Sequence, residues 1–325
     1  MPMDHRSLFA RLRPRGTSRS VSAVEAGRRT RQRFATMSAY FRRSPSKIYG
    51  KIGSLEVRLA STKQDVRRAQ RLRYKVFYEE MSAKPSLAAQ LSRRDEDRYD
   101  RVCDHLLVVD TDQEAAGQQW SQLGRRTSPR VVGTYRILRG DKIDSAEAFY
   151  SQGEYDIAPM VRAHGDSLKF MEVGRSCVLQ PYRNKRTVEL LWHGLWTYTR
   201  EHKVGVMMGC ASFEGVDPDA HAEALSFLYH ERLAPPEWRV RAHADQHVEM
   251  ARLPKDQVNA KAALKGLPPL IKGYLRLGAY VGDGAVIDHQ FCTTDVFIIL
   301  PVAAIDPRYF EHFGSPEEVG SRVAV

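Results

Sequence analysis

Short runs in which apolar and polar residues alternate recur along this chain, and segments of helical periodicity separate them. Leu55, Val57 and Leu59 show the strand pattern first, with Glu56 and Arg58 between them. Further strand-like runs lie at residues 105–110, 131–138, 169–179, 204–211, 285–291 and 296–302, and helical periodicity marks residues 61–81, 187–202, 268–277 and the segment after 217. The polar segment 111–130 is typical of a hairpin insertion. This alternation predicts a mixed sheet covered by helices.

The positive charge of the chain is concentrated at its start. Residues 1–50 contain twelve of the 50 Lys and Arg residues and two of the 39 acidic ones, and so carry +10 of the formal net charge of +11. A basic arm predicts an anionic partner, and the nearly neutral remainder shows no nucleic-acid reader motif, which favours a membrane surface over nucleic acid. We therefore expect a basic, disordered arm over 1–50, with a passive extension as the alternative, one domain over 51–314, and a tail over 315–325.

The apolar runs and the cysteines indicate the cellular compartment in which the protein is expected. No apolar run is long enough to span a bilayer, and the N-terminus has no apolar segment of the kind found in secretory signals. The four cysteines lie far apart and form no Cys/His cluster, which favours reduced thiols and argues against a metal site. We expect a cytoplasmic protein, with peripheral binding to the inner face of the cell membrane.

Arg73 lies within the apolar stripe of the first expected helix, whose start is indicated by the capping-box spacing of Ser61 and Gln64. It is four residues from both Ala69 and Phe77, which places it on the covered side of that helix. A guanidinium there needs a carboxylate partner or an anionic substrate, unless it extends to the sheet edge.

Two pairs of charged residues precede or interrupt expected strands. Asp97 and Asp100 come just before the second strand, where loop residues can reach a cleft, although on this pair alone a solvated charged turn is the better explanation. Glu172 and Arg175 lie inside a strand that reads as central, where ionised groups are rarely buried unless they are paired. Gly174 between them would permit a bulge that turns a side chain toward the same cleft.

These residues, in this order, resemble the pattern of the acyl-homoserine-lactone synthase branch of the GNAT-like acyltransferases. That pattern is Arg-x-x-x-Phe, Asp-x-x-Asp, Gly-x-x-Arg and Glu-x-x-Arg, and this chain has Arg73 and Phe77, Asp97 and Asp100, Gly133 and Arg136, and Glu172 and Arg175. The resemblance implies an α/β (α+β) fold of GNAT type, in which a mixed, mostly antiparallel sheet is flanked by helices, here with a C-terminal extension.

Residues 178–187 occupy the place of the GNAT pyrophosphate loop. That loop normally contains glycines whose backbone N–H groups approach a pyrophosphate, but this segment has Arg183, Lys185 and Arg186 and no glycine. The change disfavours coenzyme A and favours a donor with a single phosphate on an acidic carrier. Acyl carrier protein with its phosphopantetheine arm meets both conditions, with no other cofactor.

Several longer sequence segments are similar to those of the L-ornithine Nα-acyltransferases of bacterial ornithine-lipid synthesis. The matching segments are residues 72–81, 103–110, 174–179, 185–192, 209–215, 268–277 and 294–301, so the similarity covers about residues 53 to 314. It implies that a 3-hydroxyacyl group moves from acyl carrier protein to the α-amine of ornithine, giving lyso-ornithine lipid. The basic arm lies outside the similarity.

Ornithine carries one carboxylate and two ammonium groups, and the charged residues of the pattern can be matched to them. We assign the carboxylate to Arg73 or Arg136 and the side-chain ammonium to Asp97 or Asp100, with Phe77 in the same substrate-binding region. Holding both ends of ornithine would leave its α-amine at the thioester.

The α-amine attacks a thioester only when it is neutral, so a base is required. Glu172 is the candidate base, with Arg175 holding it in place. Two alternatives remain: an acyl-homoserine-lactone-type synthase that uses S-adenosylmethionine, against which the long C-terminal third argues, and a basic lipid-binding protein without catalysis.

Overall fold

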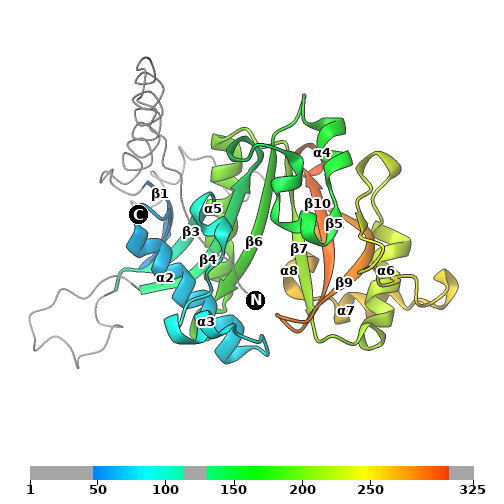
Figure 1. Ribbon diagram of the computed structural model, residues 1–325, viewed down its shortest axis with the longest axis horizontal. Coiled ribbons are helices and arrows are strands. Elements are labelled where there is room, and N and C mark those ends of the chain that lie inside the picture. The colour runs from blue at the N-terminus through cyan, green and yellow to red at the C-terminus, as the bar shows by residue number, and fades with distance from the viewer. Residues whose placement is uncertain (1–46, 113–129, 307–325) are drawn as a thin grey trace, which may run out of the picture. The chain divides into compact units, whose positions relative to one another are not determined.

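The computed structural model describes residues 47–112 and 130–306, and within them a single ten-stranded sheet forms the centre of the fold (Figure 1). The strand order is β1-β2-β3-β4-β6-β7-β10-β9-β8-β5. The strands are β1 Ile48–Ile52, β2 Leu55–Leu59, β3 Asp104–Asp110, β4 Arg130–Arg139, β5 Tyr155–Asp156, β6 Phe170–Val178, β7 Val206–Glu214, β8 Arg241–Ala242, β9 Tyr280–Asp288 and β10 Thr293–Pro301. Only β6–β7 and β8–β9 pair in parallel, so the expected mixed, mostly antiparallel sheet is confirmed.

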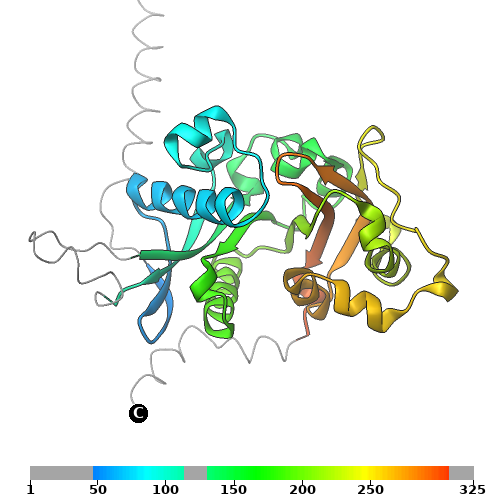
Figure 2. The same cartoon turned by 90° about the horizontal axis from the view of Figure 1, so that it is seen from below.

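Helices cover both faces of the sheet (Figure 2). One face, called the α2 face below, packs against α2 (Lys63–Tyr74) and α4 (Ala158–His164). The other, called the α5 face, packs against α5 (Lys185–Glu201), α6 (Ala222–Arg232), α7 (Ala260–Gly266) and α8 (Pro269–Arg276). A short helix α3 (Leu87–Ser92) follows α2 along the chain. None of the helices in the described ranges combines the length and apolar character that a bilayer crossing requires.

The first helix differs from the expectation in its N-cap and in the helix type of its last turns. Thr62, not Ser61, is its N-cap, because the Thr62 hydroxyl accepts the Asp65 N–H at 3.0 Å. After Tyr74 the chain continues as a π-helix, η1 (Lys75–Glu80), so the helical segment does reach the expected end near residue 81.

Other expectations on domain boundaries fall at the limits of the described residues. Strand β1 starts at Ile48, so residues 48–50 of the expected arm belong to the sheet. Residues 1–46, 113–129 and 307–325, which include most of the arm, the hairpin insertion and the tail, lie outside the described residues.

Strands β6 and β7 diverge after only three paired residues. Their parallel register ends at Glu172 opposite Met208, and no ladder pair joins the described residues of the two strands beyond that point. Gly209 follows with φ +151°, and a side chain there would collide with the backbone carbonyl of Val173. A glycine is therefore required where the strands separate, because no other residue fits both the conformation and the close approach.

A bulge in β6 lies beside this separation. The register of β6 against β4 shifts between Gly174 and Cys177, as expected, but the residue in the left-handed conformation is Arg175 with φ +50°, not Gly174. A non-glycine residue in that conformation is strained, and such strain persists only where surrounding contacts hold it. The bulge turns the Arg175 side chain into the cavity described next.

Candidate active site

A cavity of about 530 Å³ occupies the space between the diverging strands β6 and β7. Its walls come from residues 172–178 of β6, residues 207–212 of β7 and several neighbouring elements on both faces of the sheet. Because successive side chains of a strand point to opposite faces, the cavity has two chemically different parts. One part is apolar and opens on the α5 face, and the other is charged and opens on the α2 face.

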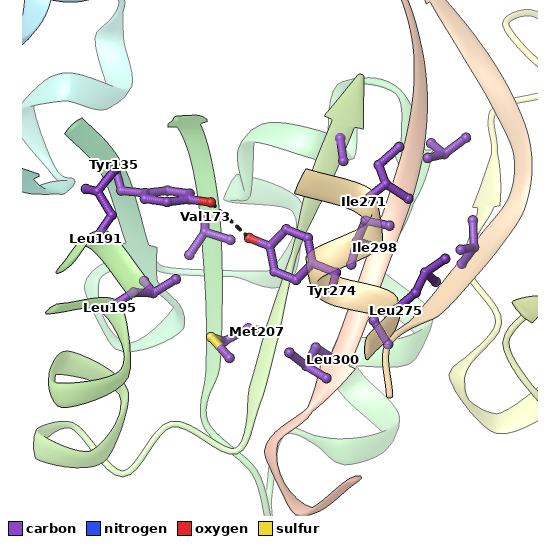
Figure 3. Packing of buried hydrophobic residues seen from close by; sticks show 14 of the residues in the cluster. Tyr135, Val173, Leu191, Leu195, Met207, Ile271, Tyr274, Leu275, Ile298 and Leu300 are labelled. Atoms are coloured by element: carbon purple, nitrogen blue, oxygen red, sulfur yellow. Dashed lines mark hydrogen bonds between the residues drawn. The ribbon is translucent and has the colours of Figure 1, made fainter. Parts of the chain in front are cut away.

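The apolar part is lined by Val173, Met207, Leu270, Ile298 and the rings of Tyr135 and Tyr274. Figure 3 shows Tyr135 of β4 and Tyr274 of α8 pointing toward each other across this space. Their hydroxyl oxygens are 3.5 Å apart, and both side chains are buried. The two hydroxyls, with the Ser176 side chain beside Tyr135, therefore form a small polar group within the apolar part.

The charged part is lined by Arg136 of β4, Glu172 and Arg175 of β6, Glu154 before β5 and Asp295 of β10. All five come from elements that meet on the α2 face at the point where β6 and β7 separate. The charged part of the cavity thus brings together three of the residues expected from the sequence and two that were not singled out.

Arg73 is completely buried but lies outside the cavity lining. Its Nε donates to Asp95 Oδ2 at 2.7 Å, and one terminal nitrogen donates to both oxygens of Asp100 at 2.9 and 2.7 Å. Burial alone would raise the pKa of Asp100, but the Arg73 charge outweighs it and holds that pKa well below its usual range. Of the partners that the sequence left open for Arg73, the structure supplies carboxylates of the protein itself.

Arg136 and Arg175 share the acidic loop that precedes β3. Arg136 donates to Asp97 at 2.6 Å and to Asp100 at 3.3 Å. Arg175 lies 3.4 Å from Asp95 and 3.6 Å from Asp97, and its guanidinium is 4.4 Å from the centre of the Phe291 ring. Asp97 and Asp100 therefore hold arginines, and the alternative of a solvated turn is wrong for the buried Asp100.

Glu172 is buried and accepts three hydrogen bonds. They come from the backbone N–H groups of Tyr150 and Ser151, at 2.7 and 2.8 Å, and from the Ser151 hydroxyl at 2.5 Å. Burial raises the pKa of the carboxyl although these hydrogen bonds oppose the shift. The expectation that Arg175 holds Glu172 is wrong, because Arg175 pairs with the acidic loop while the segment around Ser151 orients Glu172.

The cavity also has an aromatic wall on the side of η1. Phe77 is half-buried there, and its ring meets that of Phe291 edge to face with 5.5 Å between centres. Phe77 therefore lines the cavity, and its place in the substrate-binding region stays a prediction.

The basic residues of the loop before α5 lie at the end of the cavity nearest η1. Arg183 lines the cavity and pairs with Glu80 at 2.5 Å. Lys185 and Arg186 open α5 and are exposed, and Lys185 lies 3.5 Å from Glu189 on the next turn. Glu80 and Glu189 offset part of this positive charge, and the exposed Lys185 and Arg186 lie next to Arg183 in sequence at what is called the basic end of the cavity below.

Sequence reasoning missed Glu154 and Asp295. Glu154 follows a series of 3-10 turns between Ala146 and Gly153 that shows no periodicity. Asp295 sits inside β10, which the apolar pattern had started one residue later, at Val296. A signal for Asp295 was present nonetheless, since an acidic residue next to a run of five buried apolar residues needs an explanation.

Comparison with known proteins agrees with this geometry. Residues 72–193 match the family model described as acetyltransferase (GNAT) domain. An L-ornithine N(alpha)-acyltransferase of Brucella abortus is 49% identical over 82% of this chain and 92% of its own length, and one of Agrobacterium fabrum is 48% identical over 83% and 89%. An N-acyl amino acid synthase from uncultured soil microbes, at 10% identity, covers 79% of this chain and 98% of its own with a TM-score of 0.42, which adds nothing to these matches.

The sheet, its separated strands and the GNAT match define an acyltransferase of GNAT-like fold. An enzyme is thereby established, which removes the alternative of a lipid-binding protein without catalysis. The identities of 46–49% to three L-ornithine N(alpha)-acyltransferases, over more than four fifths of the chain, identify the family within this fold class. The chain belongs to the family of L-ornithine N(alpha)-acyltransferases.

Proposed function

We propose that this enzyme transfers a 3-hydroxyacyl group from acyl carrier protein to the α-amine of L-ornithine, giving lyso-ornithine lipid. The observation that carries the proposal is a cavity that joins an apolar part on one face of the sheet to a charged part on the other. An acyl chain fits the first and a zwitterionic amino acid the second. The names of the relatives supply ornithine as the acceptor.

The chemistry takes place where the two parts meet. The neutral α-amine attacks the thioester carbon, a C–N bond forms, the C–S bond breaks, and the thiolate of the carrier arm takes up a proton. The oxygen of the tetrahedral intermediate needs hydrogen-bond donors. Beyond Glu172 and Met208, backbone groups of β6 and β7 have no ladder partner across the gap and are candidates for this role.

Glu172 is the proposed base, acting directly or through one water. It lies at the last paired position of β6, at the border between the two parts of the cavity. Its pKa is raised by burial, which brings a carboxylate closer to the range useful for accepting a proton near neutral pH. Ser151 and the backbone of residues 150–151 keep its side chain in place.

The ornithine carboxylate is assigned to Arg175. Arg73 is enclosed by Asp95 and Asp100, outside the cavity, so we no longer propose it as a substrate ligand. Arg136 lines the cavity but its Nη1 already donates to two aspartates. Arg175 also lines the cavity, and its contacts with Asp95 and Asp97, at 3.4 and 3.6 Å, are longer than those of Arg136, so we assign the carboxylate to Arg175.

The 3-hydroxyl of the acyl chain would find its partner at Tyr135 and Tyr274. The Tyr135 hydroxyl also has Ser176 as a neighbour, whereas the long hydrogen bond to Tyr135 leaves the Tyr274 hydroxyl able to bind a further polar group. In apolar surroundings one hydroxyl on the chain would be favoured there over a methylene.

The carrier protein is proposed to dock at the basic end of the cavity. Arg183 lines the cavity there, and the exposed Lys185 and Arg186 project at the start of α5. Acyl carrier protein is an acidic partner, and complementary charge of this kind mainly sets the rate of encounter and the choice of partner. The phosphopantetheine arm would then reach between β6 and β7.

The basic arm is proposed to hold the enzyme peripherally on the inner face of the cell membrane, where a lipid product must go. The proposal rests on the charge of residues 1–50, because each basic residue near an anionic surface contributes about 1 kcal/mol. Deleting residues 1–46 keeps β1 intact and should leave turnover of soluble substrates unchanged while weakening binding to anionic vesicles in low salt. Equal co-sedimentation of the two proteins would show that the membrane contact lies elsewhere.

The proposed activity is tested with the purified full-length enzyme, 3-hydroxyacyl carrier protein and a panel of amino acids. Thiol release should depend on ornithine, and mass spectrometry should find the Nα-acylated product. S-adenosylmethionine replaces ornithine in a parallel reaction, because turnover with it alone would favour an acyl-homoserine-lactone-type synthase and contradict the proposal.

A further inference from the structure

Two carboxyl groups of the cavity, those of Glu154 and Asp295, have no cationic partner at ion-pair distance among the described residues. Glu154 accepts a hydrogen bond from the thiol of Cys210 at 3.2 Å, which is a weak donor. Asp295 is 7% exposed, and its Oδ1 has no hydrogen-bond partner. Thr293, two residues earlier and on the same face of β10, is 4% exposed; its hydroxyl lies close enough to lower the pKa of Asp295 but makes no hydrogen bond of normal geometry.

Burial and mutual repulsion both act on these carboxyls. Burial raises the pKa of Glu154 to about 7, and the charge of Asp295 adds to the shift. Burial likewise raises the pKa of Asp295 to about 6, with a contribution from Asp288 and partial opposition from the nearby hydroxyls. Arg175 lowers both values, and Cys210 lowers that of Glu154, but neither restores the ordinary pKa.

A buried carboxylate without a cationic partner destabilises the folded protein unless a ligand binds to it. Buried carboxylates are normally paired, and an unpaired acceptor in low dielectric is destabilising. Arg175 cannot serve as the full partner, because it lies against Asp95 and Asp97. A cation entering this part of the cavity would meet two carboxylates and one hydroxyl that have no other strong partner.

The carboxylates expected from the sequence are not available for this task. Asp100 accepts from Arg73 and Arg136, and Asp97 accepts from Arg136 with Arg175 close by. Their negative charge is already balanced by arginines, so a second cation gains little there.

We infer that Glu154 and Asp295, with the Thr293 hydroxyl, form the subsite that binds the side-chain ammonium of the amino-acid acceptor and so select a diamino acid. This inference rests on the proposed function. Arg175 would hold the carboxylate at the other side of the charged part of the cavity, where its charge acts on both acids. The α-amine would then lie between the two anchors, at the border with the apolar part.

The test compares ornithine with norvaline, which has the same carbon skeleton without the side-chain amine. Initial rates at substrate concentrations far below KM give kcat/KM for both acceptors in wild type, Glu154→Gln and Asp295→Asn. We expect each variant to lower kcat/KM for ornithine at least about 30-fold, as for truncation of one partner of a buried charge pair, and to change that for norvaline less than about threefold. The ratio of the two is the diagnostic quantity.

Glu214→Gln is the matched control, since it makes the same change of charge at an exposed residue of the cavity rim on β7. It should leave the ornithine-to-norvaline ratio unchanged. An equal fall with both acceptors in the two test variants would assign the carboxyls to the α-amine or to folding and would overturn the inference. An unchanged ratio would also overturn it, whereas failure of wild type to acylate ornithine at all would refute the proposed function instead.

Discussion

Arg73 offers a sharp test, because sequence and structure assign it different roles. The guanidinium is fully buried and holds Asp95 and Asp100 through hydrogen bonds of 2.7 to 2.9 Å. Replacing it in Arg73→Met leaves the two buried carboxylates with only the longer contacts to Arg136 and Arg175, at 3.3 and 3.4 Å, and breaking a buried pair in this way costs about 3–5 kcal/mol. For a domain of this size that lowers Tm by roughly 10 °C.

The loss should depend on pH, and its sign follows from Asp100. The pKa of this carboxyl is lower in the folded protein than the value of about 3.9 in an unfolded chain, so its ionised form contributes stability above pH ~4. That contribution disappears as pH falls through the folded-state pKa. The deficit of Arg73→Met should therefore be complete at pH 7 and shrink in acid.

Urea unfolding followed by tryptophan fluorescence measures the free energy of unfolding of both proteins. Arg68→Met is the control, because Arg68 lies on the same helix but makes a partly exposed pair with Asp65, worth about 0–1 kcal/mol. If Arg73→Met loses less than 1 kcal/mol and instead raises KM for ornithine at constant kcat, Arg73 binds substrate and the structural account of it is wrong.

Three further outcomes follow from the site. Glu172→Gln should lower kcat by about 10²–10⁴-fold if Glu172 is the base, and the unfolding free energy by about 1–3 kcal/mol because an amide N–H₂ would face backbone donors; a folded variant of normal activity contradicts the assignment. Reversing Lys185 and Arg186 to Glu should raise KM for the acylated carrier, as added salt should, whereas equal wild-type turnover with acyl-CoA would argue against a carrier-bound donor. KM for ornithine should rise as pH falls from 8 to 5, because Glu154 and Asp295 lose their charge below about pH 7 and 6, while KM for norvaline stays flat.

Much of the sheet could be predicted from the sequence because its strands carry their pattern locally. The runs that became β2, β3, β4, β6, β7 and β10 alternate or are apolar throughout, and each predicted range overlaps the observed one. The burial of Arg73 was predictable for the same reason, since its place in an apolar stripe is a property of one helix.

What could not be predicted depends on contacts between distant segments. Asp95 shares its loop with four other charged residues between 93 and 97, and nothing local distinguishes it as the partner of Arg73. Glu172 and Arg175 were expected to pair because they are neighbours in sequence, yet the bulge at Arg175 sends the two side chains to different partners. Glu154 acquires its surroundings only when β10 is placed against β7.

The three residue pairs between β6 and β7 have a mechanical consequence. They are the only ladder that joins strands β1, β2, β3, β4 and β6 to strands β7, β10, β9, β8 and β5 in the described sheet. C-terminal to Glu172 and Met208, β6 and β7 form no ladder pair, and the cavity lies between them; at its far end the Lys84 N–H donates to the Gln290 carbonyl at 2.7 Å. An acyl chain and its carrier arm bound between these strands would contact both halves of the sheet and bury apolar surface between them. Binding of the donor would therefore stabilise the association of the two halves during the reaction.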